Sequence, residues 1–592
     1  MILNKTVIKR ILEKILLVLS LIGFFLVIYE EGFNQPFLSI SDSHFVLKVI
    51  LTIIWTGYIC QFFLAKWVKF NFKKLVAEVL LIFLISVVLF FIFSDFKLPG
   101  LDAHTSVTSD RFLVDFLVSV VFLIELSKLS LGVGELKLNP QMIFILSFLT
   151  LIGVGTVLLM LPKATYEPIH LVDALFTATS AVCVTGLIVL DTAKDFTLFG
   201  QLIIMILFQI GGLGMMTFTS FFGFFFKGNF SFQNQLFLKD FINEDRFGQV
   251  FNTLLKVITF TFLVEGLGAV LIYLSLDNGL FEGTMDMIFF SVFHSVSGFC
   301  NAGFSILSDG LYQEGFRQNY NMQLIIALSI VLGGIGFPVV LSYYQYLKHL
   351  IKGLYRKLVF GESYRYVPRI VNIGTRLVMI TTGILLLIGF VVFWVFEEEY
   401  SLKGIEGYGK FVTAFFGAVT PRTAGFNTVD MTSMAAPTIL LYLLLMWIGA
   451  SPGSTGGGLK TSTFAVAILS TLSIAKGKDR VEVFRREISN ATLKKAFAVT
   501  FLSVMMMGTT VFLLKLFDRD LPLTSVVFEA FSAFSTVGLS LGITSGLSFG
   551  SKMVLIVTMF VGRIGILTFL IGLSRGVKNL SYRYPEESVF IT

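Results

Sequence analysis

Cysteine, histidine and charged residues are scarce in this chain of 592 residues, and each scarcity excludes a class of protein. Charged residues make up 14% of the sequence, about half of their share in soluble domains. The three cysteines, Cys60, Cys183 and Cys300, have no CxxC spacing, so neither a disulfide framework nor a zinc site is indicated. The chain also lacks a GxxxxGK[ST] motif for nucleotide binding. We therefore expect neither a soluble enzyme nor an organic cofactor in this chain.

Hydrophobic residues are abundant instead, at 55% of the chain with 66 phenylalanines. This composition leaves too little polar surface for a soluble globule and predicts an all-α integral membrane protein in a lipid bilayer. A membrane-spanning helix needs about 20 mostly apolar residues. Twelve such runs lie near residues 11–29, 45–65, 75–94, 111–131, 141–161, 197–226, 250–275, 322–346, 373–396, 437–475, 496–516 and 551–574. The tenth run is too long for one straight span and is interrupted in its middle.

The charged residues predict the orientation of these spans. The formal charge is +7, from 45 basic and 38 acidic residues, and the cations lie in short loops between apolar runs. This distribution follows the positive-inside rule and does not indicate a nucleic-acid partner. If the spans alternate, the basic clusters at 66–74, 348–369 and 476–495 fall on one side, and acidic residues such as Glu397–Glu399 fall on the other. Both termini are then expected in the cytoplasm.

Four short segments that lie between paired spans share one pattern. Each has a half-helix of roughly ten residues followed by a glycine motif, and each begins with phenylalanine ten positions before the glycine. The segments are 176–187, 293–304, 415–426 and 528–539, aligned on Gly186, Gly303, Gly425 and Gly538. Three of them have serine six positions before the glycine, whereas the third has Val419. A repeat of this length predicts four repeated structural units.

The glycine motif has a physical purpose at membrane depth. Irregular backbone survives there only where it is buried in protein or lines a watery cavity, and glycine lets successive carbonyls face one direction. Four such strands around one axis would form a ring of carbonyl oxygens for a cation, with the negative ends of the half-helices directed toward it. The absence of acidic side chains favours a monovalent cation. The alternative is that the glycines merely allow close helix packing, but four glycines in register favour a pore. The predicted filter comprises Val184, Thr185, Gly186, Asn301, Ala302, Gly303, Thr423, Ala424, Gly425, Thr536, Val537 and Gly538.

Two further features lie where a gate would be expected. Residues 449–463 interrupt the tenth run with Pro452 and a cluster of glycines that cannot sustain a regular helix. Arg563 lies in the last span, where a charge marks an ion pathway by default. We predict a flexible gating loop beneath the third filter segment, with Lys460 as a mobile cation, although a proline kink and a structural anchor are the alternatives. The predicted gate residues are Gly453, Gly456, Gly457, Gly458, Lys460 and Arg563.

From about residue 138 onward, the sequence resembles the KtrB-type subunit of the Ktr/Trk/HKT superfamily of potassium transporters. The resemblance rests on DALFTATSAVCVTGLIVLDT, FHSVSGFCNAGFS, TPRTAGFNT, SPGSTGGGLKT, FSTVGLS, GRIG and the ending YRYPEE. It implies a homodimer in the cell inner (plasma) membrane, K⁺ held at the filter carbonyls as the transported ion, and a cytosolic, nucleotide-binding RCK/KTN subunit that opens the gate. In the plant branch, serine at the first filter position accompanies sodium preference, so Gly186 resembles the potassium-preferring pattern. Na⁺ remains the alternative ion.

The expected architecture is four pseudo-symmetric span–pore-helix–span repeats that form one pore, preceded by four extra transmembrane helices for which we have no functional account. The predicted domains are 1–136 for these extra helices, then 137–240, 241–365, 366–490 and 491–592 for repeats 1 to 4, the last with a cytoplasmic tail. The predicted function is potassium uptake down the electrochemical gradient. A sodium-conducting or Na⁺-coupled transporter is the first alternative, and a non-conducting scaffold is the second. An enzyme is not expected, since the scattered acids and five histidines include no repeat-related pair.

Overall fold

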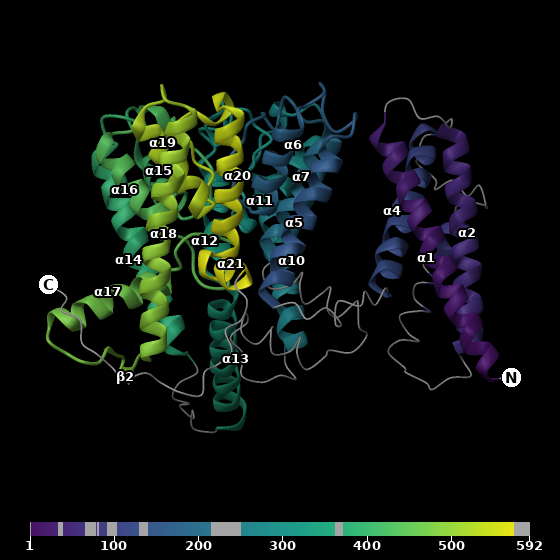
Figure 1. The fold of residues 1–592 in the computed structure, drawn as a ribbon, viewed down its shortest axis with the longest axis horizontal. Coiled ribbons are helices and arrows are strands. Elements are labelled where there is room, and N and C mark those ends of the chain that lie inside the picture. The colour runs from purple at the N-terminus through teal and green to yellow at the C-terminus, as the bar shows by residue number, and fades with distance from the viewer. Residues whose placement is uncertain are drawn as a thin grey trace.

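The computed structural model describes residues 2–33, 40–65, parts of 79–90, 103–128, 140–214, 250–361 and 371–573. These residues form helices joined by loops, with one small antiparallel hairpin of β1 (Glu482–Val483) and β2 (Arg486–Glu487) (Figure 1). The all-α fold predicted from composition is therefore confirmed. The basic cluster at 66–74, most of the predicted span at 75–94, and the ending YRYPEE at 582–587 lie outside the described residues.

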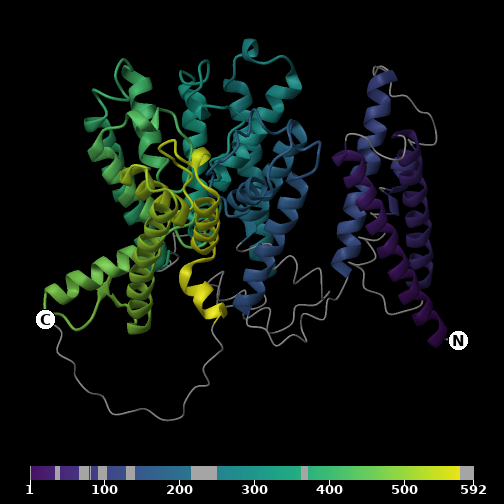
Figure 2. The same cartoon turned by 45° about the horizontal axis from the view of Figure 1, so that its top comes forward.

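The N-terminal helices form a bundle of their own beside the main body (Figures 1 and 2). The described members are α1 (Ile2–Gly32), α2 (Ile40–Ala65) and α4 (Ala103–Lys128), and each packs against the other two. A buried hydrogen bond from Tyr58 Oη to Glu125 Oε1, 2.5 Å long, joins α2 to α4. The bundle contacts the main body at the end of α1, where Lys163 Nζ donates to the Glu30 carbonyl at 2.7 Å.

The main body contains four successive groups of helices, each with a short buried helix between two others. The described helices are α5 (Pro140–Leu159), α6 (Leu171–Val182) and α7 (Leu198–Gly214); α10 (Val250–Ser275), α11 (Thr284–Cys300), α12 (Tyr320–Ile335) and α13 (Phe337–Phe360); α14 (Ile373–Phe396), α15 (Gly407–Val419), α16 (Ala436–Trp447) and α17 (Thr461–Ala475); and α18 (Asn490–Phe517), α19 (Leu523–Ser535), α20 (Phe549–Ile564) and α21 (Ile566–Leu573). The short helices α6, α11, α15 and α19 supply much of the buried core, because their aromatic and small side chains pack against the flanking helices.

Six helices of the described chain are long and apolar enough to cross a membrane, or eight if each bent pair counts as one span. The six are α1, α2, α5, α10, α14 and α18, and all coincide with predicted runs. The predicted run at 437–475 is interrupted as expected, since α16 ends at Trp447 and α17 begins at Thr461. Helix α4 has only a shorter apolar stretch, Leu113–Phe122, and the second half of the run at 197–226 lies outside the described residues.

The expectation of one continuous helix at 322–346 and another at 551–574 is wrong. Both runs bend by 95°, between α12 and α13 and between α20 and α21. A glycine lies at each break, with φ of +93° at Gly336 and +88° at Gly565, a conformation that residues with a side chain rarely adopt. At the first break Pro338 follows in the opening turn of α13, where proline starts a helix readily. Glycine therefore redirects the chain at both places.

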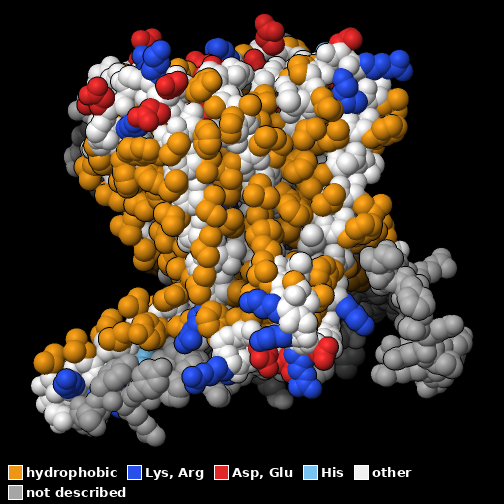
Figure 3. Space-filling model, turned by 90° about the vertical axis from the view of Figure 1, so that its left-hand side faces the viewer, with side chains coloured by type: hydrophobic (Ala, Val, Ile, Leu, Met, Phe, Trp, Pro, Cys, Tyr) orange, Lys and Arg blue, Asp and Glu red, His pale blue; other side chains and the backbone are white. Residues whose placement is uncertain are grey.

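The surface of the main body is divided into three zones (Figure 3). On the face that Figure 3 shows, hydrophobic side chains form a wide belt across the middle, and charged side chains gather above and below the belt. Phe501 and Phe512 of α18 and Leu387 of α14 are exposed on this belt, between 63% and 66% of their full accessibility. Large apolar side chains at this exposure would be unfavourable in water and are suited to lipid. This zoning is that of a protein embedded in a bilayer.

Candidate functional site

The four glycine motifs all follow the C-terminal ends of the short buried helices and adopt the same unusual backbone. The residue two positions before each glycine has positive φ: +56° at Val184, +59° at Asn301, +68° at Thr423 and +50° at Thr536. The four glycines have positive φ as well, between +70° and +93°. A positive φ is uncommon outside glycine and is a true outlier for a β-branched residue, at a cost of roughly 1–3 kcal/mol each. Three of the four residues, Val184, Thr423 and Thr536, are β-branched, and strain repeated in this way indicates a conformation required by function.

The four glycines are neighbours in a closed cycle. A β-carbon built on Gly186 would strike the carbonyl oxygen of Ala302 in the second motif, and one on Gly303 would lie 2.9 Å from that of Ala424 in the third. One on Gly425 would strike the carbonyl of Val537 in the fourth, and one on Gly538 would strike that of Thr185 in the first. Each motif thus contacts the next, and the fourth returns to the first, although consecutive motifs are more than 100 residues apart in sequence.

Side-chain hydroxyls behind the motifs hold this backbone. Ser180 Oγ accepts a hydrogen bond from the Gly186 amide at 3.1 Å, and Ser532 Oγ accepts one from the Gly538 amide at 3.1 Å. Each serine lies six positions before its glycine. Ser297 donates to the Phe304 carbonyl at 2.7 Å, one residue after the second glycine. In the third motif Val419 lies where the others have serine and offers no hydroxyl. The next residue, Thr420, supplies one and donates to the Phe426 carbonyl. Every motif therefore has a hydroxyl behind it, and the sequence pattern located three of the four.

A second set of glycines, not recognised from the sequence, lets the following helix press against each short helix. A β-carbon on Gly211 of α7, Gly333 of α12 or Gly562 of α20 would collide with the carbonyl that precedes the motif, at Val182, Phe299 and Phe534 respectively. The signal was available in the matching strings GGLG (211–214), GGIG (333–336) and GRIG (562–565). Because these residues are glycines, α7, α12 and α20 can each approach the backbone of the preceding short helix to van der Waals contact.

The loop between α16 and α17 occupies the corresponding place in the third group. The Ser451 amide donates to the Gly334 carbonyl at 3.1 Å, and Thr455 Oγ1 donates to the Phe299 carbonyl at 3.2 Å. A β-carbon on Gly456 would strike Thr423, and one on Gly457 would strike Thr536. The loop therefore lies directly against the first residues of the third and fourth motifs. Lys460, predicted as a mobile cation, donates from Nζ to the Gly456 carbonyl at 2.7 Å.

Arg563 connects this loop to the first group of helices. Its side chain is 1% exposed, with Nη1 donating to the Thr455 carbonyl and Nη2 to the Gly211 carbonyl at 2.5 Å. It lies in the last turn of α20, at the position that is glycine in GGLG and GGIG. No ion pair with an acidic side chain is formed by Arg563 among the described residues. Among the described residues, its guanidinium group donates only to these two backbone carbonyls.

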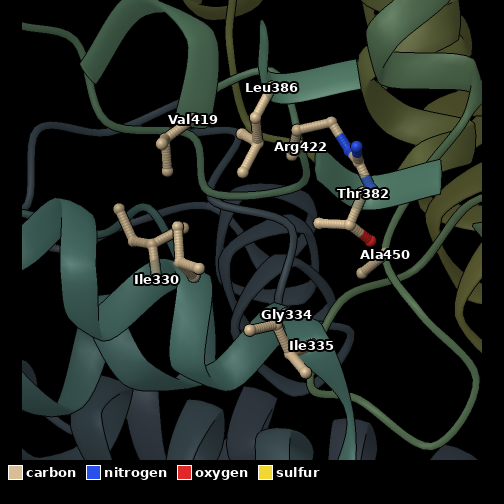
Figure 4. A pocket seen from close by; sticks show the side chains of 9 residues that line it. Ile330, Gly334, Ile335, Thr382, Leu386, Val419, Arg422 and Ala450 are labelled. Atoms are coloured by element: carbon tan, nitrogen blue, oxygen red, sulfur yellow. The ribbon is translucent and has the colours of Figure 1, made fainter. Parts of the chain in front are cut away.

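A second buried arginine lies to the side of the motifs. Arg422 is 7% exposed and donates from Nη2 to the Gly449 carbonyl at 2.9 Å, at the start of the loop. It borders a small pocket of about 20 Å³ whose other walls come from α12, α14, the end of α15 and the loop. Figure 4 shows Leu386, Val419 and Ile330 on the apolar side of this pocket, with Thr382 near the guanidinium group. None of the twelve motif residues lines this pocket, and the Arg422 hydrogen bond joins the residue before the third motif to the loop.

The remaining polar candidates support the motifs. Glu265, an acid whose partner could not be named from sequence, accepts a hydrogen bond from Gln209 Nε2 at 2.9 Å. Cys300 Sγ donates to Gln209 Oε1 at 3.1 Å, which links this pair to the second motif. His294 contacts the Phe290 carbonyl and Ser305 Oγ, both at 2.9 Å. No group of three or more potential metal ligands was found among the described side chains.

Comparison with known proteins adds the family. A family model described as TrkH, cation transport protein, matches residues 135–577. The chain is 37% identical over 449 residues to Ktr system potassium uptake protein B of Vibrio alginolyticus, covering 76% of this chain and 94% of the relative. It is 37% identical over 455 residues to the protein of the same name from Bacillus subtilis, covering 76% of this chain and 96% of the relative. It is 34% identical over 470 residues to potassium/sodium uptake protein NtpJ of Enterococcus hirae, covering 77% and 98%.

A solved structure shares the fold. The potassium transporter TrkH from Vibrio parahaemolyticus matches with a TM-score of 0.57 at 17% sequence identity, over 84% of this chain and 96% of that one. The family model covers three quarters of the sequence, including all four motifs, the loop and Arg563. The chain is therefore a multi-pass membrane protein that belongs to the TrkH family of cation transport proteins.

Proposed function

We propose that this chain is a potassium-uptake transporter whose four motifs form one selectivity filter. The observation that carries the proposal is the closed cycle of Gly186, Gly303, Gly425 and Gly538, in which each glycine abuts a carbonyl of the next motif. Backbone carbonyls arranged around one axis can replace the hydration shell of K⁺. The names of the curated relatives, which are potassium or potassium/sodium uptake proteins, support the same ion.

The filter comprises the three residues that end at each glycine. Positive φ at the first and third of these residues turns successive carbonyls toward one side, and the hydroxyls of Ser180, Ser532 and Thr420 hold the surrounding backbone. The short helices end at the filter, so that their partly negative C-termini favour cations over anions. No carboxylate is part of the twelve filter residues, which favours a monovalent ion.

The loop at 449–463 is the gate, and Arg563 holds it closed. The loop lies against Thr423 and Thr536, at the inner start of two filter segments. The two hydrogen bonds from Arg563 fix it to α7 on the opposite side, and the guanidinium charge repels an arriving cation. Opening requires that the loop, with its flexible Gly453, Gly456, Gly457 and Gly458, leave this position.

Transport needs no ATP hydrolysis by this chain. A membrane potential of 100 mV contributes about 2.3 kcal/mol for each elementary charge, which is sufficient to accumulate a monovalent cation. We further infer a homodimer in the plasma membrane with both termini in the cytoplasm, and a separate RCK/KTN subunit that senses nucleotide and releases the loop. Sodium is the second candidate ion, because one relative is named a potassium/sodium uptake protein.

Rubidium-tracer uptake into proteoliposomes of the purified chain tests this proposal. Potassium should compete better than sodium or lithium, and Gly186→Ser should weaken that preference by displacing the Ala302 carbonyl from the ring. The assay is repeated on a variant that lacks residues 453–458, in which the gate cannot close. Absence of uptake by both proteins, each shown to be folded, would refute the proposal.

A further inference from the structure

Among the described residues, helix α13 (Phe337–Phe360) packs only weakly against the rest of the protein. Only Phe337 and Val339 of its 24 residues are buried. Beyond its first turn it has an apolar stripe, here defined as Leu347, Ile351, Leu354 and Leu358, whose side chains are between 54% and 76% exposed. These positions repeat every three or four residues and share one face of a helix. Some other surface must cover the stripe in the working protein.

A basic stripe lies beside the apolar one. Lys348, Lys352 and Arg356 follow each other at four-residue intervals, and Lys357 is adjacent. The helix has no Asp or Glu, so its positive charge is not neutralised within the element. An apolar face flanked by Lys and Arg, without acidic residues, is characteristic of helices that lie in the plane of an anionic membrane surface.

The placement of the helix fits that surface. It bends by 95° from α12, which is part of a span, so its axis runs across the direction of the spans. In Figure 3 the arm at the lower left, which is α13 of Figure 1, has hydrophobic side chains on the edge nearest the hydrophobic belt. An acidic protein partner would match the charge but would leave this continuity of apolar surface unexplained. The bilayer explains both.

The first residue of α13 is hydrogen-bonded to the proposed gate loop. The Phe337 amide donates to the Gly453 carbonyl at 3.0 Å, and a β-carbon on Gly336 would lie 2.6 Å from the Pro452 carbonyl oxygen. The Ser451 amide also donates to the Gly334 carbonyl at 3.1 Å, one turn earlier. A change in the angle of α13 must therefore break or move the contacts that hold Pro452 and Gly453.

We propose that α13 binds the anionic lipid surface of the inner leaflet, with the apolar stripe among the acyl chains and the basic stripe at the phosphates, and that this binding holds the gate loop in its closed position. The second half rests on the proposed function of the loop as a gate. The first half stands on the helix alone, and the two are tested separately.

Lipid binding is measured on the full-length chain, in a variant whose three cysteines are replaced by serine or alanine. A spin label is introduced by Leu354→Cys on the apolar stripe, or by Gln345→Cys on the basic side as the matched control. The proteins are placed in vesicles of phosphatidylcholine alone or of phosphatidylcholine with phosphatidylglycerol. With phosphatidylglycerol, the label at position 354 should become accessible to oxygen and protected from a water-soluble nickel complex, whereas the label at 345 should stay accessible to nickel.

Removal of charge provides the second arm. The variant Lys348→Gln/Lys352→Gln/Arg356→Gln should lose the protection that phosphatidylglycerol gives, and Lys476→Gln/Lys478→Gln/Arg480→Gln, at the same end of the molecule, should keep it. A label at 354 that stays open to nickel in both kinds of vesicle overturns the proposal. Protection that requires a higher protein density or an added soluble subunit also overturns it, in favour of a second copy or a protein partner.

Rubidium leak tests the coupling to the gate. In vesicles with phosphatidylglycerol, the α13 charge variant should leak several-fold faster than the unmodified chain, whereas in phosphatidylcholine alone the two should be equal. Confirmed lipid binding without this difference, in a protein whose gate-loop deletion does leak, overturns the coupling. If no variant conducts rubidium, the proposed transport function fails, and the spin-label result still decides whether α13 binds lipid.

Discussion

The third group of helices has the same short helix and glycine motif as the other three groups, but it differs from them in the helix that follows. In all four, a short buried helix leads into a strained glycine motif. In the first, second and fourth groups, the next helix continues past the motif and presses a glycine against its backbone. In the third, α16 ends at Trp447, and a loop takes that place. The third group therefore has an irregular loop where the other groups have a continuous helix. The backbone of this loop is hydrogen-bonded to Gly333 and Gly334 of α12 and to Arg563 of α20.

The difference separates two physical requirements. The proposed filter needs four equivalent carbonyl segments, and the third motif has the same positive-φ backbone as the others. A gate needs backbone that can be held by a few bonds and then released, which a continuous helix cannot provide. In the proposed function, the break between α16 and α17 supplies this element, while the four motifs keep the same backbone conformation. The glycines permit the break, and the surrounding protein satisfies its polar groups, as membrane depth demands.

The largest effect is expected where the four groups are alike. Gly425→Ala in the third motif and Gly538→Ala in the fourth should each lower potassium-selective rubidium uptake by at least about tenfold. Both glycines have positive φ, and a methyl group at either would strike a carbonyl of the neighbouring motif, at a cost of more than about 1–2 kcal/mol. Gly508→Ala is the control, because among the described residues outside its own helix no atom lies within 4 Å of a β-carbon there. Full selectivity in Gly425→Ala would remove the third motif from the filter.

The next effect concerns the bond between the broken and unbroken groups. Arg563→Gly gives the fourth group the GGIG string of the second and removes both hydrogen bonds to the Thr455 and Gly211 carbonyls. Hydrogen bonds to charged groups contribute about 1.5–3 kcal/mol each, so the passive leak of rubidium should rise about tenfold or more. Arg519→Ala, an exposed arginine of the loop after α18, is the control. A leak no greater than that of the control would mean that Arg563 only anchors structure.

A moderate effect should distinguish how the motifs are supported. Ser532→Ala removes the acceptor for the Gly538 amide, a loss of about 1 kcal/mol, and should reduce the preference for potassium over sodium several-fold. Thr420→Val should act similarly in the third motif, since it removes the bond to the Phe426 carbonyl. Val419→Ser, which restores the serine of the other motifs, should change little because Thr420 already holds the turn. Competition by sodium in the rubidium assay measures all three.

The smallest effect is expected from the N-terminal bundle, which touches the first group near Lys163. A truncation that lacks residues 1–136 should still take up rubidium, within about a factor of two, because loss of surface contacts away from the core is usually worth less than about 0.5 kcal/mol. Lys163→Ala in the full chain should behave in the same way. Loss of selectivity in a folded truncation would show that the bundle supports the filter and is not confined to regulation or assembly.

Regularities along the chain were sufficient to locate much of the candidate site. The spacing of four glycines, the serine six positions earlier and the unbroken apolar runs predicted the motifs, and Pro452 with its glycines predicted the break between α16 and α17. The bends at Gly336 and Gly565 were missed because the apolar runs continue through them, and hydropathy does not register a turn. The compensation of Val419 by Thr420 was missed because it depends on the direction of one side chain.

The sequence by itself determined the class of protein, the repeated motifs and the places where a helix cannot continue, since these follow from composition, periodicity and the backbone preferences of glycine and proline. Only the tertiary structure decided which motif abuts which, that Arg563 bonds to both Thr455 and Gly211, and that the start of α13 is hydrogen-bonded to the loop at 449–463. Those contacts join residues as many as 352 positions apart. They result from how helices pack in three dimensions, and a one-dimensional pattern carries no information on the distance between such residues.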